Sequence, residues 1–152
     1  MEYSIYLDSP LDFNPTVEVS SCHCEYGDRF LLLRRHPKKS QGDTWGLPGG
    51  KHETGENPRA AVIREIHEEV GLHIDDDGLE FVGKLYVRLP HVDYVFHMFR
   101  KCYLVLPSIK LGLEEHLESK WVTMHEAMRL PLITGGAEAL LYYKKILSEK
   151  SV

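Results

Sequence analysis

The sequence is poor in cysteine, and it lacks both a long apolar run and a basic excess. The only cysteines are Cys22, Cys24 and Cys102. Such a small, odd number argues against a disulfide framework and favours a reducing compartment. The first ten residues, MEYSIYLDSP, have neither the basic nor the apolar region of a secretory leader. No apolar run approaches the roughly 18 residues of a membrane span, so we expect a cytoplasmic protein without a membrane partner.

Positive charge is also scarce, with 18 Lys and Arg against 23 Asp and Glu and a formal net charge of −5. A protein that binds duplex nucleic acid normally has a basic surface, so we expect no nucleic-acid polymer as a partner. An anionic small molecule would need local cations or metal ions to offset the repulsion.

The remaining composition is ordinary, with 43% hydrophobic and 27% charged residues among 152. This composition is typical of a soluble globular protein. The length predicts one domain over residues 1–152, which is large enough to bury a core without disulfides.

Strand and helix patterns are mixed along the chain without a regular alternation. Alternating apolar residues predict strands at 16–24, 29–35, 79–89, 94–106 and 120–123. Helices are predicted at 58–70, 124–130 and 136–149. Three segments read as irregular, namely the lead-in 1–15, the long loop 36–50 and the polar loop 111–119. This order predicts an α+β fold, or a sandwich built on a mixed sheet.

The helix predicted at 58–70 carries an unusual acidic cluster. Glu65, Glu68 and Glu69 fall within five residues and occupy roughly 100° of the helix circumference. They point away from the apolar stripe that contains Val62 and Ile66. One interpretation is a solvated acidic face, which costs only a few tenths of a kcal/mol per like-charged pair. The other is a site for metal cations.

The flanking residues favour the metal site. Gly50 is followed six positions later by Glu56, and eight positions after that by REIHEEVGL. The chance of this pattern is on the order of 10⁻⁹ per start position. It resembles the box of the Nudix hydrolases, and WGLP before it and KWVTMHEA after it look like MutT-like members. The matching residues are Gly50, Glu56, Arg64, Glu65, Ile66, Glu68, Glu69, Gly71 and Leu72.

This resemblance implies a Nudix-type α/β/α sandwich with a mixed sheet and a divalent metal, Mg²⁺ or alternatively Mn²⁺. Mg²⁺ is a hard cation that prefers oxygen ligands. The resemblance places it on Glu65, Glu68 and Glu69, with the Gly50 carbonyl as a further ligand. It also implies that Glu56 and Arg64 pair and hold the loop against the helix, although a purely structural salt bridge is an alternative.

A further acidic residue is usual in the loop after the long strands of this family. Glu115 lies six positions before Trp121, as in MutT-like members, and is the candidate for a metal ligand or the general base. Glu114 and Glu118 are alternatives for the same role, and Glu65 is an alternative general base. A solvated loop is the simpler interpretation for each of the three loop residues.

Several side chains are candidates for holding the organic part or the phosphates of a substrate. Arg35 and Lys51, with Arg34 as a weaker candidate, could contact phosphate. Ring stacking is expected of the aromatic candidates Trp45, Tyr94 and Phe96, with Tyr86 as a further one. A solvated strand end is the alternative for the arginines, and a place in the core is the alternative for the aromatic residues.

The resemblance implies a Mg²⁺-dependent pyrophosphohydrolase of nucleoside diphosphates linked to another group. Nucleoside triphosphates, cut to monophosphate and pyrophosphate as in MutT-like nucleotide-pool cleaning, are the leading substrate class. The alternatives are ADP-ribose, nucleotide sugars or dinucleoside polyphosphates, and a non-catalytic nucleotide-binding module. Members that remove oxidised guanine nucleotides often have an Asn before the last helix, where PLITGG offers only Thr134. We therefore do not expect strict selectivity for oxidised guanine nucleotides.

A separate expectation is that the protein forms a homodimer.

Overall fold

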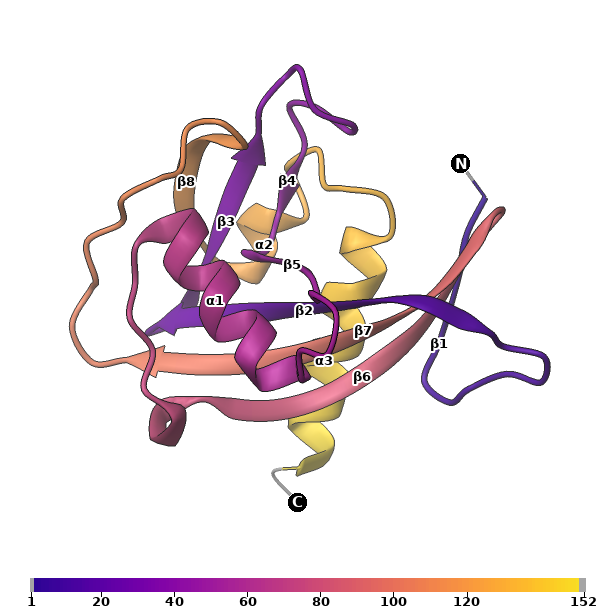
Figure 1. The fold of residues 1–152 in the computed structure, drawn as a ribbon. Helices are drawn as coiled ribbons and strands as arrows, with labels where there is room; N and C mark the ends of the chain where they lie inside the picture. The colour runs from indigo at the N-terminus through magenta and orange to yellow at the C-terminus, as the bar shows by residue number, and fades with distance from the viewer. Residues whose placement is uncertain (1, 151–152) are drawn as a thin grey trace.

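The computed structural model describes residues 2–150, apart from the side chain of Asp76, and shows a mixed sheet covered by helices on both faces (Figure 1). The strands are β1 (Ser4–Tyr6), β2 (Pro15–Tyr26), β3 (Arg29–Arg35), β4 (Trp45–Gly46), β5 (Gly49–Lys51), β6 (Glu80–Leu89), β7 (Val92–Tyr103) and β8 (His116–Val122). The helices are α1 (Pro58–Val70), α2 (Met124–Ala127) and α3 (Gly136–Lys150), with a 3₁₀ turn, η1, at Asp76–Gly78.

The sheet has the strand order β1-β6-β7-β2-β3-β4, with β5 pairing to β2 and β8 pairing to β3. Strands β2 and β7 run parallel, whereas the other pairs are antiparallel. Helix α1 lies on one face of the sheet, and α2 and α3 lie on the other (Figure 1). The mixed-sheet α/β/α sandwich expected from the sequence is confirmed.

Strands β2 and β3 separate almost as soon as they leave their hairpin. They pair only at Glu25 with Phe30 and at Tyr26 with Arg29. Farther along, β2 pairs with β5 instead, over Val19–Ser21, while β3 pairs with β4 and β8. We call this opening in the sheet the β2–β3 split. Because the sheet is not closed there, side chains from α1 and from the α3 face can reach a common space.

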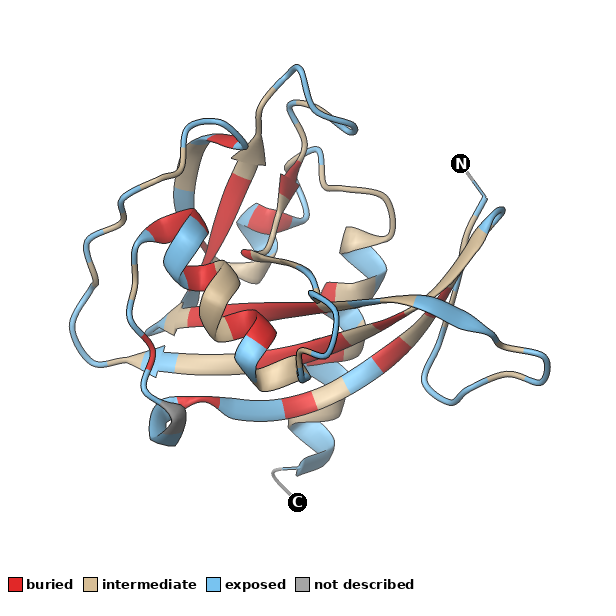
Figure 2. Ribbon diagram, in the orientation of Figure 1, coloured by how far each residue is buried: buried red, intermediate tan, exposed pale blue. Residues whose placement is uncertain are grey.

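Two apolar layers hold α1 and α3 in place (Figure 2). On the α1 face, Val62, Ile66 and Val70 are fully buried against Cys22 and Leu31. The opposite layer contains the buried α3 residues Leu140 and Tyr143. Odd and even positions of the strands thus supply different layers, as the two-residue period of a strand requires.

Helix α1 begins and ends where the sequence predicts. The Asn57 side chain accepts a hydrogen bond from the Ala60 N–H (2.8 Å), and Pro58 occupies the first turn. Gly71 ends the helix at a φ of 73°, a left-handed conformation that suits glycine, and donates its N–H to the His67 carbonyl. These caps fix how far the acidic residues lie from the helix end.

The structure corrects several predicted boundaries. The lead-in contains strand β1, and the loop 36–50 contains β4 and β5, all of which are too short to show a period. The polar loop 111–119 ends early, because β8 begins at His116 and pairs with β3. The helix predicted at 124–130 ends at Ala127.

Strand β7 is also shorter than predicted. It stops at Tyr103, whose register partner Tyr26 is the last residue of β2. Beyond that point no strand within residues 2–150 pairs with the chain, and Leu104 and Val105 are 98% and 79% exposed despite their apolar character. Between residues 2 and 150, no helix has both the length and the apolar character needed to cross a membrane.

Candidate metal and substrate site

Arg64 ties together three carboxylates beside the β5–α1 loop. Its Nε and Nη2 donate to the two carboxylate oxygens of Glu56, both at 2.8 Å. Its Nη1 donates to Glu65 Oε1 (3.0 Å) and Glu68 Oε2 (3.2 Å). Nη2 also reaches the Lys51 carbonyl at 3.1 Å, so the loop is fastened to the helix by one side chain. The structure thus brings Glu56 and Arg64 together in a bidentate ion pair.

The pair is charged throughout the ordinary pH range. The hydrogen bonds from Arg64, supported by the Glu53 N–H, lower the pKa of Glu56 to about 2. The same contacts raise the pKa of Arg64 above its usual value. Glu65 experiences the opposite effect, because burial raises its pKa although Arg64 opposes the shift.

Glu69 is the most deeply buried carboxylate of the cluster, and its Oε1 accepts a hydrogen bond from the Gly49 N–H at 2.7 Å. Burial raises the pKa of Glu69 well above the ordinary range, and the charges of Glu65 and Glu115 raise it further, against the lowering by the Gly49 N–H. A buried group in this environment needs either a proton or a nearby cation to be stable. Crowded carboxylates of this kind fit a hard divalent cation.

A cavity of about 230 Å³, which we call the acidic cavity, lies between α1 and the turn before β8. Its lining includes five carboxylates and one glycine, namely Glu65, Glu68, Glu69, Gly112, Glu114 and Glu115. Glu68 and Glu115 are exposed, whereas Glu65 is partly buried. On one side of the cavity, therefore, the carboxylate oxygens are partly or fully buried. The other side is open to solvent.

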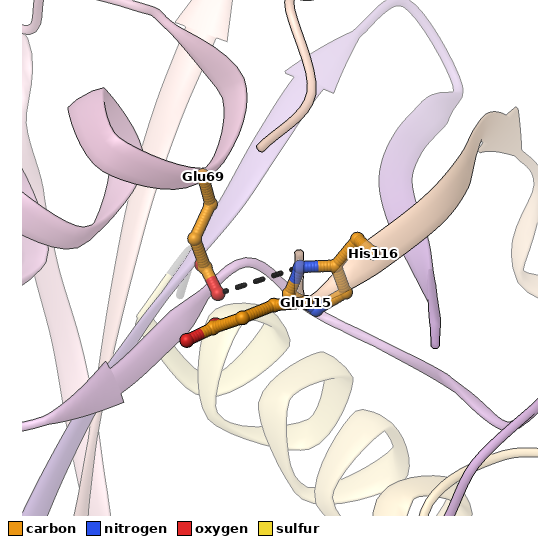
Figure 3. Close-up of side chains that lie close together, drawn as sticks. All are labelled: Glu69, Glu115 and His116. Carbon is orange, nitrogen blue, oxygen red and sulfur yellow. Dashed lines mark ion pairs between the residues drawn. The ribbon is translucent and has the colours of Figure 1, made fainter. Parts of the chain in front are cut away.

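His116 joins this cluster, although the sequence did not mark it (Figure 3). Ligand atoms of Glu69, Glu115 and His116 all lie within 4.8 Å of one another. Glu69 comes from the end of α1, Glu115 from the turn before β8, and His116 from the first position of β8. Burial lowers the pKa of His116. Its position next to Glu115 was the only signal in the sequence, and the expectation of a polar loop there obscured it.

A second cavity of about 220 Å³, which we call the apolar pocket, lies at the β2–β3 split. Its lining shares Glu69 with the acidic cavity, and it also includes Gly50 and His116. Most of the remaining residues in its wall are apolar, and they come from the sheet and from the α3 face. These apolar residues include Leu32, Trp45, Leu47, Phe96, Leu132, Ile133, Ala139 and Leu140. An apolar wall beside carboxylates suits a ligand with one flat organic part and one phosphate part.

Four of the five substrate-binding candidates line this pocket. They are Arg35, Lys51, Trp45 and Phe96. Trp45 is only 5% exposed and packs within the core, so it forms the wall of the pocket. The fifth candidate, Tyr94, lines a neighbouring cavity that shares Phe96 with the apolar pocket.

Three of the alternative candidates, Glu118, Arg34 and Tyr86, line neither cavity. Glu118 is bonded to Arg34 Nε at 3.2 Å and does not line the acidic cavity, in contrast to Glu114 and Glu115. Arg34 is further occupied by Asp43 at 2.7 Å. Tyr86 packs edge-on against Phe13, with ring centroids 5.4 Å apart.

Comparison with known proteins identifies the family. The family described as the NUDIX domain matches residues 15–143, which is most of the chain. This chain belongs to the Nudix family. In this structure the box runs from β5 through α1, and the resemblance to the Nudix family is confirmed. The chain is accordingly a Nudix hydrolase, an enzyme of the class that cleaves pyrophosphate bonds in nucleotide-linked substrates.

Relatives and solved structures agree with this assignment. The chain is 28% identical to the "Uncharacterized Nudix hydrolase YvcI" of Bacillus subtilis over 84% of this chain and 78% of that protein. It is 27% identical to the CTP pyrophosphohydrolase of Escherichia coli, over 76% of this chain and 82% of that protein. The crystal structure of the MutT protein from Methanosarcina mazei superposes with a TM-score of 0.73 at 23% identity, covering 94% of this chain and all 100% of that one. That last similarity concerns the fold.

Gly50 offers a direct test of how closely the Nudix loop approaches α1. A Cβ atom at this position would lie 2.5 Å from Glu65 Cδ, so Gly50→Ala must displace the Glu65 carboxylate. A displacement of about 1 Å in a catalytic group can cost about 100-fold in rate, and we expect kcat to fall by about 10- to 100-fold. The displaced group is the end of a flexible side chain, so the melting temperature should change little.

Gly83→Ala is the matched control, because an added Cβ there would make only ordinary contact with Ile146 at 3.4 Å. Steady-state kinetics and thermal unfolding of both variants check the prediction. A Gly50→Ala enzyme with full kcat would show that Glu65 need not keep its position against the loop.

Proposed function

We propose that this Nudix hydrolase converts nucleoside triphosphates to nucleoside monophosphates and pyrophosphate in a Mg²⁺-dependent reaction. The observation that carries the proposal is the shared wall of the two cavities, since Glu69 lines both the acidic cavity and the apolar pocket. A base and its sugar can therefore lie against Trp45 and Phe96 while the phosphates extend towards the carboxylates.

Names of several relatives support a triphosphate substrate. The Escherichia coli relative is called a CTP pyrophosphohydrolase, and another relative is the dihydroneopterin triphosphate diphosphatase of Haemophilus influenzae, 28% identical over 76% of this chain. The organic parts in these names differ, whereas the triphosphate is common to both. A pocket with apolar walls and few side-chain hydrogen-bonding groups is consistent with selection mainly on the phosphate part.

The residues for the proposed metal are Glu65, Glu68, Glu69 and Glu115, with the Gly50 carbonyl as a further ligand. A bound divalent ion would supply neutralisation of the phosphate oxygens and polarisation of the attacked phosphorus. Arg64 orients two of these carboxylates through its bonds to Glu65 and Glu68, and its bond to Glu56 keeps the loop in place. The protein thus supplies an ordered set of anions before any substrate arrives.

The phosphate and proton-transfer roles fall to residues that line the cavities. Arg35 and Lys51, in the wall of the apolar pocket, are assigned to phosphate contacts. Glu65 and Glu115 are the two candidates for the general base, because both line the acidic cavity. A general base must lie within hydrogen-bond reach of the attacking water, and both carboxylates line the cavity assigned to the metal.

A substrate panel with product identification tests this proposal. The purified chain is incubated with Mg²⁺ and, separately, with a ribonucleoside triphosphate, a deoxynucleoside triphosphate, 8-oxo-dGTP, ADP-ribose, a nucleotide sugar and a dinucleoside polyphosphate. We expect the highest kcat/KM for a triphosphate, with monophosphate and pyrophosphate as products, and no strict preference for 8-oxo-dGTP. Turnover of nucleotide sugars or ADP-ribose alone would contradict the triphosphate assignment while leaving the hydrolase class intact.

A homodimer and a cytoplasmic location remain predictions from the sequence. Light scattering of the purified chain tests the first, with a species of twice 17.5 kDa as the expected result. A single species at the monomer mass would contradict it.

A further inference from the structure

His116 is a buried imidazole whose Nδ1 has no hydrogen-bond partner among the described residues. The residue is 5% exposed, and Nδ1 is closed off from solvent. The Glu69 Oε2 atom lies 3.8 Å from Nδ1. An enclosed ring nitrogen without a partner is costly, so its place beside two carboxylates calls for an explanation.

The separation of His116 Nδ1 and Glu69 Oε2 is too long for a hydrogen bond, which requires at most about 3.2 Å. It is shorter than the sum of two metal–ligand bonds, which is about 4.2 Å for a nitrogen and an oxygen each near 2.1 Å. The separation is therefore compatible with one ion that contacts both atoms. A carboxylate oxygen of Glu115 lies within 4.8 Å of a ligand atom of each of the other two residues, so a small side-chain shift would let Glu115 supply a third contact (Figure 3).

The backbone holds this arrangement in place. The Gly112 N–H donates to the Glu69 carbonyl at 3.0 Å, and the His116 N–H donates to the Gly112 carbonyl at 3.3 Å. The His36 N–H in turn donates to the Glu115 carbonyl at 2.7 Å. The end of α1 and the start of β8 are thus linked through Gly112, which fixes the positions from which the three side chains project.

We propose that His116 Nδ1 is a metal ligand, so that Glu69, Glu115 and His116 hold a divalent ion through mixed oxygen and nitrogen donors. An imidazole ligand favours first-row transition ions, whereas Mg²⁺ favours oxygen. The site should accordingly bind Mn²⁺ in preference to Mg²⁺, and the preference should depend on His116. This inference rests on the proposed function only in placing a divalent ion beside α1.

Metal titration without any nucleotide tests the proposal. The full chain, freed of metal, is titrated calorimetrically with MnCl₂ and with MgCl₂, and the Mn²⁺ complex is examined by pulsed electron paramagnetic resonance. We expect a nitrogen coupling typical of bound imidazole in the wild type. In His116→Gln the coupling should disappear and the Mn²⁺ affinity should fall at least about 10-fold, since even outer partners of a metal site are worth about 10- to 100-fold. The Mg²⁺ affinity should change by less than about 3-fold.

His125→Gln is the matched control, because His125 is exposed on α2 and should leave both the coupling and the affinities unchanged. A wild-type spectrum without nitrogen coupling would overturn the proposal, and this measurement does not depend on any variant folding. An unchanged ratio of Mg²⁺ to Mn²⁺ dissociation constants in a folded His116→Gln chain would overturn it as well.

The two proposals can fail separately. Triphosphate hydrolysis with Mg²⁺ in a protein without nitrogen coupling would remove only His116 as a ligand. Nitrogen coupling in a protein that hydrolyses no triphosphate would leave the mixed metal site standing and remove the proposed substrate class.

Discussion

Replacement of Glu69 by glutamine is expected to lower kcat at least about 100-fold, the scale of losing one catalytic electrostatic group. Glu69 lines both cavities, and its carboxylate belongs to the cluster with Glu115 and His116. Glutamine keeps the size of the side chain and can still accept the hydrogen bond from the Gly49 N–H. The change therefore removes the charge while retaining the packing.

The same variant should be more stable than the wild type at pH 8 in the presence of a chelator. The folded protein raises the pKa of Glu69, mainly through burial, so the folded state holds this proton more tightly than the unfolded chain does. Such a group makes stability fall as pH rises above the ordinary glutamate pKa of about 4.3. Glutamine cannot ionise, so its advantage in melting temperature should shrink as the pH falls towards 4.

Kinetics and thermal unfolding of Glu69→Gln and of Glu149→Gln measure both effects. Glu149 is exposed on α3, so its replacement makes the same charge change away from the site and should alter neither quantity appreciably. Unchanged turnover in Glu69→Gln would remove Glu69 from the proposed metal set. A loss of stability at pH 8 would mean that its charge is compensated in the folded chain without metal.

Replacement of Arg64 by alanine should have the largest effect on stability. The arginine side chain is only 22% exposed and contacts the carboxylates of Glu56, Glu65 and Glu68. Its removal leaves the mostly buried carboxylates of Glu56 and Glu65 without a cation, and breaking a buried pair in this way costs up to about 3–5 kcal/mol. We expect a comparable fall in the free energy of unfolding, and kcat should fall because the loop before α1 loses its attachment.

The stability deficit of Arg64→Ala should depend on pH in a defined direction. Pairing lowers the pKa of Glu56 in the folded protein to about 2. The contribution of the pair is therefore fully present above the unfolded pKa of about 4.3 and is lost as the pH falls towards 2. Denaturant unfolding between pH 3 and pH 7 should show the two proteins converging at the acidic end.

Arg34→Ala is the control for Arg64→Ala. Arg34 also makes two ion pairs, with Asp43 and Glu118, but both partners are exposed by more than 40% of their side chains. Exposed pairs contribute about 0–1 kcal/mol, so this variant should lose little stability. Equal losses in the two variants would contradict the special role of the Arg64 cluster.

The sequence predicted the helix and the box well, because both depend on local signals. Caps at Asn57 and Gly71 mark the ends of α1, and the spacing from Gly50 to Gly71 is a pattern that needs no knowledge of the fold. The pairing of Glu56 with Arg64 followed from the resemblance, and the structure places these two side chains in direct contact.

Features that depend on contacts between distant segments were not predictable from local patterns. The short strands β4 and β5 exist because β3 and β2 provide partners for them, and strands of only two and three residues are too short to show a period. His116 became notable only when β8 paired with β3 and brought the residue beside Glu69. Likewise, the sequence predicted ring stacking for both Trp45 and Tyr94. Only the folded chain shows that Trp45 lines the apolar pocket, whereas Tyr94 lines a neighbouring cavity.

The β2–β3 split has a consequence for how this enzyme could acquire new substrates. The phosphate half of a ligand would contact α1, whereas the organic half would contact β4 and the segment before α3. That last segment is far from α1 in the sequence. Substitutions at Leu132 or Ile133 could therefore retune selectivity while the reaction chemistry stays intact. Divergent specificity within one scaffold would then require changes in wall positions only, with no new domain and no alteration of the box.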